Sequence, residues 1–124
     1  MIKFFVVLFL IAITPKVASA VNIYDGIYQI NPNIGFVTFS EKNGTMIAVV
    51  NQTYGGYSWG AGWGTMNGSS VQLSTILGTL NQTINVNLTS ASTFSATIVS
   101  CNPNTAGYYC LFSAGQTFTG TKVW

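Results

Sequence analysis

The fold is decided by the stretch Tyr57-Ser58-Trp59-Gly60-Ala61-Gly62-Trp63-Gly64. In an extended chain, successive side chains point to opposite faces. Tyr57, Trp59, Ala61 and Trp63 would therefore share one face, and serine and glycines the other. Helices disfavour so much glycine. The stretch predicts a strand with one aromatic face and one bare face.

Short alternating runs of the same kind recur about every ten residues on both sides of this stretch. No run places apolar residues at the helical spacing of i, i+3, i+4 and i+7. The runs predict about eight strands, at 24–30, 34–40, 45–53, 57–64, 70–77, 83–89, 93–100 and 116–124. Consecutive short strands joined by tight turns form an antiparallel meander, which closes most easily into a small barrel. A sandwich of two sheets is the alternative.

Two turns and three inward faces can be placed along these runs. Asn43-Gly44 stands between two apolar runs and predicts a type I′ hairpin. Asn67-Gly68 is a second Asn-Gly pair and predicts a second hairpin of this kind. Alternation directs three sets of side chains to the core: Tyr24, Gly26, Tyr28 and Ile30; Ile84, Val86 and Leu88; Phe94, Ala96 and Ile98.

The chain begins with the features of an export signal. One lysine precedes an apolar run of about ten residues, and the segment ends Ala18-Ser19-Ala20. We expect residues 1–20 to be a signal peptide and 21–124 a single all-β domain, secreted or periplasmic. The apolar run is shorter than the roughly 20 residues of a membrane-spanning helix.

Few charges remain after residue 20. Lys42 and Lys122 balance Asp25 and Glu41, and the whole chain contains no histidine. Nucleic-acid binding needs many cations to displace the counterions of phosphate groups, so the sequence excludes it. The predicted strands are also shorter than the roughly 9–11 residues of a membrane-crossing strand, so we do not expect membrane insertion.

Cys101 and Cys110 are the two cysteines. An exported chain meets an oxidising compartment, so we expect them to form a disulfide that closes the loop 102–109. A metal site would need further ligands, and the sequence offers no histidine and only two carboxylates. We predict no metal and no cofactor.

The residues of acid–base or nucleophilic catalysis are also scarce. The acids Asp25 and Glu41 fall at a strand start and at a hairpin, where solvation is the ordinary outcome. Lys42 and Lys122 lie in no serine-lysine motif, and the glycines at 60–64 precede neither a helix nor a lysine, as a phosphate-binding loop requires. We predict that the protein is not an enzyme.

At the level of pattern, the chain resembles small avidin-like and lipocalin-like barrels. The resemblance rests on Gly26 and Tyr28 in the first strand, the Asn-Gly hairpins and the tryptophans of the middle strand. The chain is also similar in style to short secreted bacterial proteins of uncharacterised function that have one late cysteine pair. Biotin-binding motifs are not matched, and Tyr28 stands where lipocalins have tryptophan. The resemblance implies a barrel but transfers no ligand.

The aromatic strand leaves two interpretations open. Tyr57, Trp59 and Trp63 could bind a glycan or a small apolar molecule at the barrel mouth. The interpretation we favour is that they fill the core while the glycines face outward or relieve crowding at a coiled strand. A glycine face could instead admit a partner to the backbone.

Self-association is a further expectation, because a nearly uncharged surface repels its own copies weakly. The chain could then be a homo-oligomer or a structural surface component. Five Asn-x-Ser/Thr sequons, at Asn43, Asn51, Asn67, Asn81 and Asn87, would accept sugar in a eukaryote. The short leader favours a bacterial source, where they would carry none.

Overall fold

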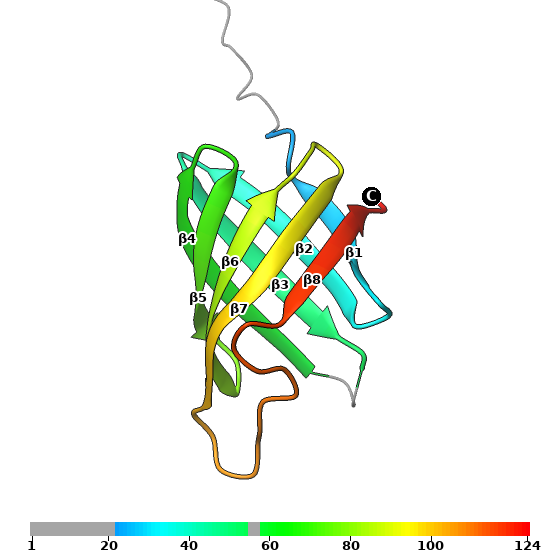
Figure 1. Ribbon diagram of the computed structural model, residues 1–124. Helices are drawn as coiled ribbons and strands as arrows, with labels where there is room; N and C mark the ends of the chain where they lie inside the picture. Colours follow the sequence, from blue (N-terminus) through cyan, green and yellow to red (C-terminus); the bar gives the residue numbers. More distant parts are fainter. Residues whose placement is uncertain (1–21, 55–57) are drawn as a thin grey trace, which may run out of the picture.

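Residues 22–54 and 58–124 are described by a computed structural model, in which every regular element is a β-strand. The predicted signal peptide lies outside the described residues, as does Tyr57. Eight strands follow one another along the chain (Figure 1): β1 Gly26–Asn31, β2 Gly35–Lys42, β3 Thr45–Gln52, β4 Ser58–Asn67, β5 Ser70–Leu77, β6 Leu80–Leu88, β7 Thr93–Pro103 and β8 Thr117–Lys122.

The strands form a closed antiparallel barrel in sequence order. Closure depends on β1, which pairs with β2 on one side and with β8 on the other. Tyr28 lies opposite Val37 in β2 and opposite Lys122 in β8. The meander and the barrel predicted from the sequence are therefore confirmed, and the two-sheet alternative is wrong. The described part of the chain contains no helix with the length and hydropathy needed to cross a membrane.

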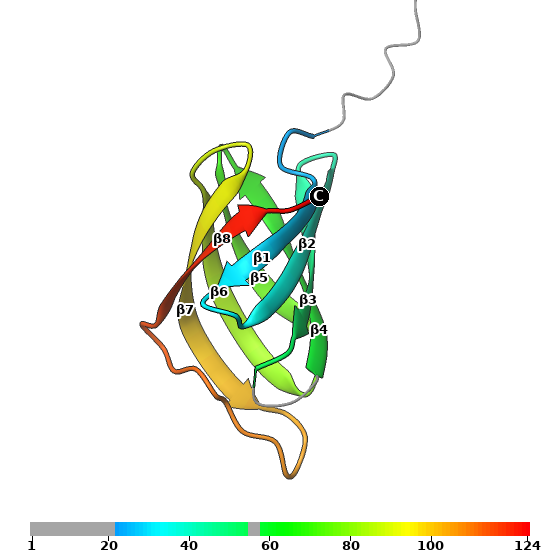
Figure 2. The ribbon, with the colours of Figure 1, turned by 90° about the vertical axis from the view of Figure 1, so that its right-hand side faces the viewer.

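The barrel has two ends of different character (Figures 1 and 2). The end that holds the C-terminus and the turns at 43–44, 68–69 and 89–92 is called the packed end. The cavity end holds the turns at 32–34 and 78–79, the segment 53–54, and the long loop 104–116 between β7 and β8. In both views this long loop extends beyond the strands.

Three aromatic rings fill the packed end. Tyr28, Phe39 and Phe94 contact one another edge to face, with ring centroids 5.2–5.6 Å apart. Met46 is buried in the same core, with no exposed surface. Aromatic pairs in this geometry stabilise a core beyond the apolar area that they bury. The packed end is therefore a well-filled core.

The Tyr28 hydroxyl donates to the carbonyl oxygen of Tyr24 at 2.8 Å and lies 3.3 Å from that of Ala91. Burial raises the pKa of Tyr28, and the nearby Asp25 carboxylate raises it further. The phenol consequently keeps its proton at neutral pH and remains a donor. It ties the segment before β1 and the turn between β6 and β7 to the packed end.

The two Asn-Gly pairs form different turns. Asn43 and Gly44 both have positive φ, 53° and 80°, and join β2 to β3 as the predicted type I′ hairpin. Asn67 instead belongs to β4 and pairs with Ser70. Gly68, at φ 61°, is then the first of two loop residues, as in a type II′ turn. The second turn is thus shifted by one residue from the predicted position.

The inward faces agree with the alternation of the sequence. Tyr28, Val86, Leu88, Phe94 and Ile98 are buried, and Ile84 packs against this core. Cys101 and Cys110 form the predicted disulfide. A disulfide is compatible with an extracellular or periplasmic location. It ties the end of β7 to the long loop at the cavity end.

Candidate ligand cavity and outer aromatic face

The tryptophans of β4 point away from the barrel. Trp59 and Trp63 are 64% and 52% exposed, so the interpretation that they fill the core is wrong. Trp63 lies opposite Ile47 in β3, and Ala61 lies opposite Val49. These neighbours are themselves about half exposed. The aromatic face of the strand is therefore the outer wall of the barrel.

The bare face of β4 points inward, toward β5. A Cβ atom on Gly64 would lie 2.0 Å from the carbonyl oxygen of Gln72, which no side chain tolerates. The same atom on Gly60 or Gly62 would lie 3.1–3.2 Å from backbone oxygens of β5, a tight but less severe contact. The prediction that the glycines face outward is therefore wrong: they face inward and let β5 approach β4 closely.

Where the glycine face has no side chains, the barrel interior is incompletely filled. Two adjoining cavities of about 90 and 100 Å³ occupy the cavity end. They share lining side chains from β3, β5 and β6: Ala48, Val50, Gln52, Leu73, Gln82 and Ile84. Protein interiors hold few voids larger than a water molecule. This hollow is therefore the strongest candidate for a binding site.

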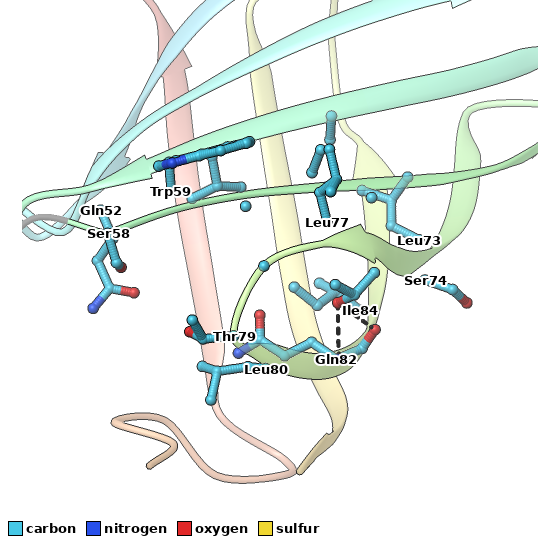
Figure 3. A pocket seen from close by; sticks show the side chains of 17 residues that line it. Gln52, Ser58, Trp59, Leu73, Ser74, Leu77, Thr79, Leu80, Gln82 and Ile84 are labelled. Atoms are coloured by element: carbon cyan, nitrogen blue, oxygen red, sulfur yellow. Dashed lines mark hydrogen bonds between the residues drawn. The ribbon is translucent and has the colours of Figure 1, made fainter. Parts of the chain in front are cut away.

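The two cavities differ in their surroundings. The 90 Å³ cavity lies between β4 and the turn from β5 to β6, and Figure 3 shows Trp59 on the β4 side, across from Thr79, Leu80 and Gln82. The 100 Å³ cavity lies deeper and is lined by apolar side chains, Phe39, Phe94 and Ile98 among them. Its polar lining residues are Gln52 and Gln82.

The amides of Gln52 and Gln82 are partly occupied. Gln52 donates from Nε2 to the carbonyl oxygen of Tyr54 at 2.9 Å, and Gln82 donates from Nε2 to Sγ of Cys101 at 3.4 Å. The backbone of Gln82 exchanges two hydrogen bonds with the Thr75 hydroxyl (Figure 3). Among the described residues, neither amide oxygen accepts a hydrogen bond. Both can accept one from a ligand.

The long loop covers part of the cavity end. Phe112 lines the deeper cavity and packs on Phe118 with ring centroids 4.9 Å apart. The Cys101–Cys110 disulfide lies two residues before Phe112. Asn104 holds the start of the loop by donating from its backbone nitrogen to the Thr79 carbonyl oxygen at 3.0 Å. The disulfide and this bond together position Phe112 over the cavity.

The charged side chains of the described residues lie at the packed end. Asp25 accepts a hydrogen bond from the backbone nitrogen of Glu41 at 2.8 Å, and Lys122 donates to the carbonyl oxygen of Ile23 at 2.8 Å. Lys42 ends β2 beside them. Within residues 22–54 and 58–124, no three His, Cys, Asp or Glu side chains come together as a metal site would require. Among the residues that line the two cavities, none is charged.

The stretch 57–64 therefore contributes to two separate features of the structure, the cavity and the outer wall. Trp59 borders the shallower cavity, whereas Trp63 stands on the outer wall away from both. Val50, Gln52, Gln82 and Phe112 were not recognised from the sequence as site residues. Ala48, with its small side chain, and Gly60 and Gly62, with none, are the signal that could have indicated an internal hollow.

The chain matches no protein-family model, no curated protein and no solved structure. The chemistry of the cavity and of the outer face is therefore what indicates the function of the protein.

Proposed function

We propose that the protein is an exported, non-catalytic barrel that binds a small apolar molecule in its cavity end. The observation that carries the proposal is the 100 Å³ apolar cavity beneath Phe112. Apolar cavities accept apolar ligands; an engineered one of about 150 Å³ binds benzene. The apolar leader at 4–13 and the disulfide support export.

The size of the cavity sets the expected affinity. Small ligands gain at most about 1.5 kcal/mol per non-hydrogen atom, and ordinary ones about 0.3. A six-atom probe such as benzene would occupy the deeper cavity and extend into its neighbour. An intermediate efficiency gives a Kd of about 1 mM, which corresponds to about 4 kcal/mol.

Filling the cavity should abolish binding. Val50 lines both cavities, whereas Val49 is the adjacent outward residue, 42% exposed. Val50→Phe would place a ring in the space that benzene needs. We expect NMR titration of the wild type with benzene to shift the methyl signals of Ile84 and Ile98, with Kd about 1 mM, and V50F to show no shift.

Val49→Phe is the matched control, because it makes the same change on the opposite face of β3. It should bind benzene as the wild type does. The proposal would be wrong if the wild type showed no methyl shifts at saturating benzene, or if V50F bound benzene as well as V49F.

Self-association is a second candidate function, and the outer wall favours it. Five side chains of β3, β4 and β5 on the outer wall are 42–64% exposed: Ile47, Val49, Trp59, Trp63 and Ile76. By contrast, the outer faces of β5, β6 and β7 carry amides and hydroxyls around a shallow groove, including Gln72, Asn85 and Thr97. Contiguous exposed apolar surface of this kind is typical of interaction sites.

Light scattering checks the second candidate. The average molecular mass of the wild type should rise with protein concentration. The Trp63→Thr variant should need at least tenfold higher concentration to reach the same degree of association. Val99→Thr is the control, since Val99 is also 42% exposed but lies on β7. A monomeric wild type at millimolar concentration would exclude self-association through this face.

A further inference from the structure

We infer that the ligand of the cavity is an uncharged amphiphile, whose hydroxyl or amide head meets Gln52 and Gln82 while its apolar tail lies beneath Phe112. The inference rests on the proposed function and adds the chemical class of the ligand. It follows from the volume of the cavity, from the polar groups at it and from the position of the charges.

The tail must be short. The deeper cavity measures about 100 Å³, two-thirds of the volume that accepts benzene. By proportion it holds roughly four non-hydrogen atoms of an apolar tail. The adjoining space of about 90 Å³ has a more polar lining that includes Thr75 and Thr79, and it leads to the turn between β5 and β6. A head group would lie on this side of the tail.

The chemistry of the head group follows from two side-chain amides that line both cavities. Gln52 comes from the end of β3 and Gln82 from the start of β6. Each uses its Nε2 in a bond within the protein, to the Tyr54 carbonyl oxygen and to Cys101 Sγ respectively. The amide oxygens are left as acceptors, and a hydroxyl or a primary amide supplies the matching donor. An apolar molecule without a donor would displace water from these oxygens without replacing its hydrogen bonds.

A charged head finds no partner at this end of the barrel. The four charged side chains after residue 20, Asp25, Glu41, Lys42 and Lys122, belong to the segments of the packed end. From the turn beside Lys42 to Gln52, β3 covers about 23 Å at the usual rise per strand residue. That distance exceeds the Debye length of about 8 Å at physiological ionic strength. Desolvating an ionised group beside this cavity would therefore go uncompensated.

A series of six-carbon probes tests the inference on the intact protein. 1-Hexanol and hexanamide present neutral heads, and hexanoate and hexylammonium present charged ones at pH 7. We expect NMR titration to show the neutral probes binding at least tenfold more tightly than the charged ones. The side-chain amide signals of Gln52 and Gln82, which line both cavities, should shift with the neutral probes.

Variants of the two amides locate the head. Gln82→Leu and Gln52→Leu should each weaken 1-hexanol about fivefold and leave benzene unchanged or tighter, because only hexanol uses the amide oxygens. Gln72→Leu is the matched control, since Gln72 is exposed on the outer face and bonds to Asn85. It should bind both probes as the wild type does. Having two variants keeps the test decisive if one of them fails to fold.

The contrary outcomes distinguish the ligand class, the position of its head group and the existence of the site. Equal binding of neutral and charged probes would overturn the uncharged class and leave the cavity site standing. Unchanged hexanol affinity in both Gln→Leu variants would overturn the placement of the head. Failure of benzene and of all four six-carbon probes to bind would overturn the proposed function together with the inference.

Discussion

Replacing Gly120 with valine is expected to lower the free energy of unfolding by about 3 kcal/mol or more, because overpacking a filled core forces rings and backbone to move. A Cβ atom on Gly120 would lie 2.0 Å from Cε1 of Phe94. Gly120 in β8 is the register partner of Phe94 in β7, so the ring covers the glycine directly. Urea denaturation of the G120V variant measures the loss.

A double-mutant cycle separates this clash from other effects of the substitution. Phe94→Leu shortens the side chain over Gly120, so the double variant should lose at least about 1 kcal/mol less than the two single losses together. Thr119→Val is the control on the exposed side of β8 and should change stability by less than about 0.5 kcal/mol. A loss below about 1 kcal/mol in G120V would show that Phe94 can move aside at little cost.

Removal of the disulfide should have the next largest effect. With nine residues of sequence separation between Cys101 and Cys110, loop-closure entropy predicts that Cys101→Ser with Cys110→Ser lowers the free energy of unfolding by about 2.5 kcal/mol. The bond also holds the loop that carries Phe112 over the cavity. Benzene affinity should therefore fall along with stability. Denaturant titration and NMR titration measure the two effects.

Chemical reduction supplies the internal control for the disulfide. Dithiothreitol should destabilise the wild type to the level of the double serine variant and leave that variant unchanged. The disulfide would have no structural role if reduction cost the wild type less than about 1 kcal/mol. Retention of full benzene affinity by the reduced protein would show that Phe112 is positioned by its packing on Phe118 alone.

Much of the barrel could be predicted because its signals are local. Each strand is indicated by alternation within a few residues. An Asn-Gly pair readily adopts the positive φ values of a tight hairpin, as Asn43 and Gly44 do here. The inward positions of Phe94, Ala96 and Ile98 follow from the same alternation. The disulfide followed from the presence of two cysteines in a chain expected to be exported.

For the aromatic strand, local signals do not predict which face points into the barrel. Alternation divides Trp59, Ala61 and Trp63 from the glycines, but a period of two is symmetric and does not say which face is inside. That choice depends on the neighbouring strands. Val71 and Gln72 of β5 lie so close to Gly64 that only a glycine fits there. The glycines had to face inward, and the tryptophans were left on the outer wall.

The sequence by itself determined an all-β chain of about eight strands, the Asn43-Gly44 hairpin, the inward apolar sets and the disulfide, because each depends on residues close together in the chain or on their composition. Tertiary structure alone decided the register in which β1 pairs with β8, the contact of Phe94 with Gly120 and the cavity beneath Phe112. These features arise where residues distant in the chain meet. Their geometry depends on the shape of the closed barrel, which no single stretch encodes.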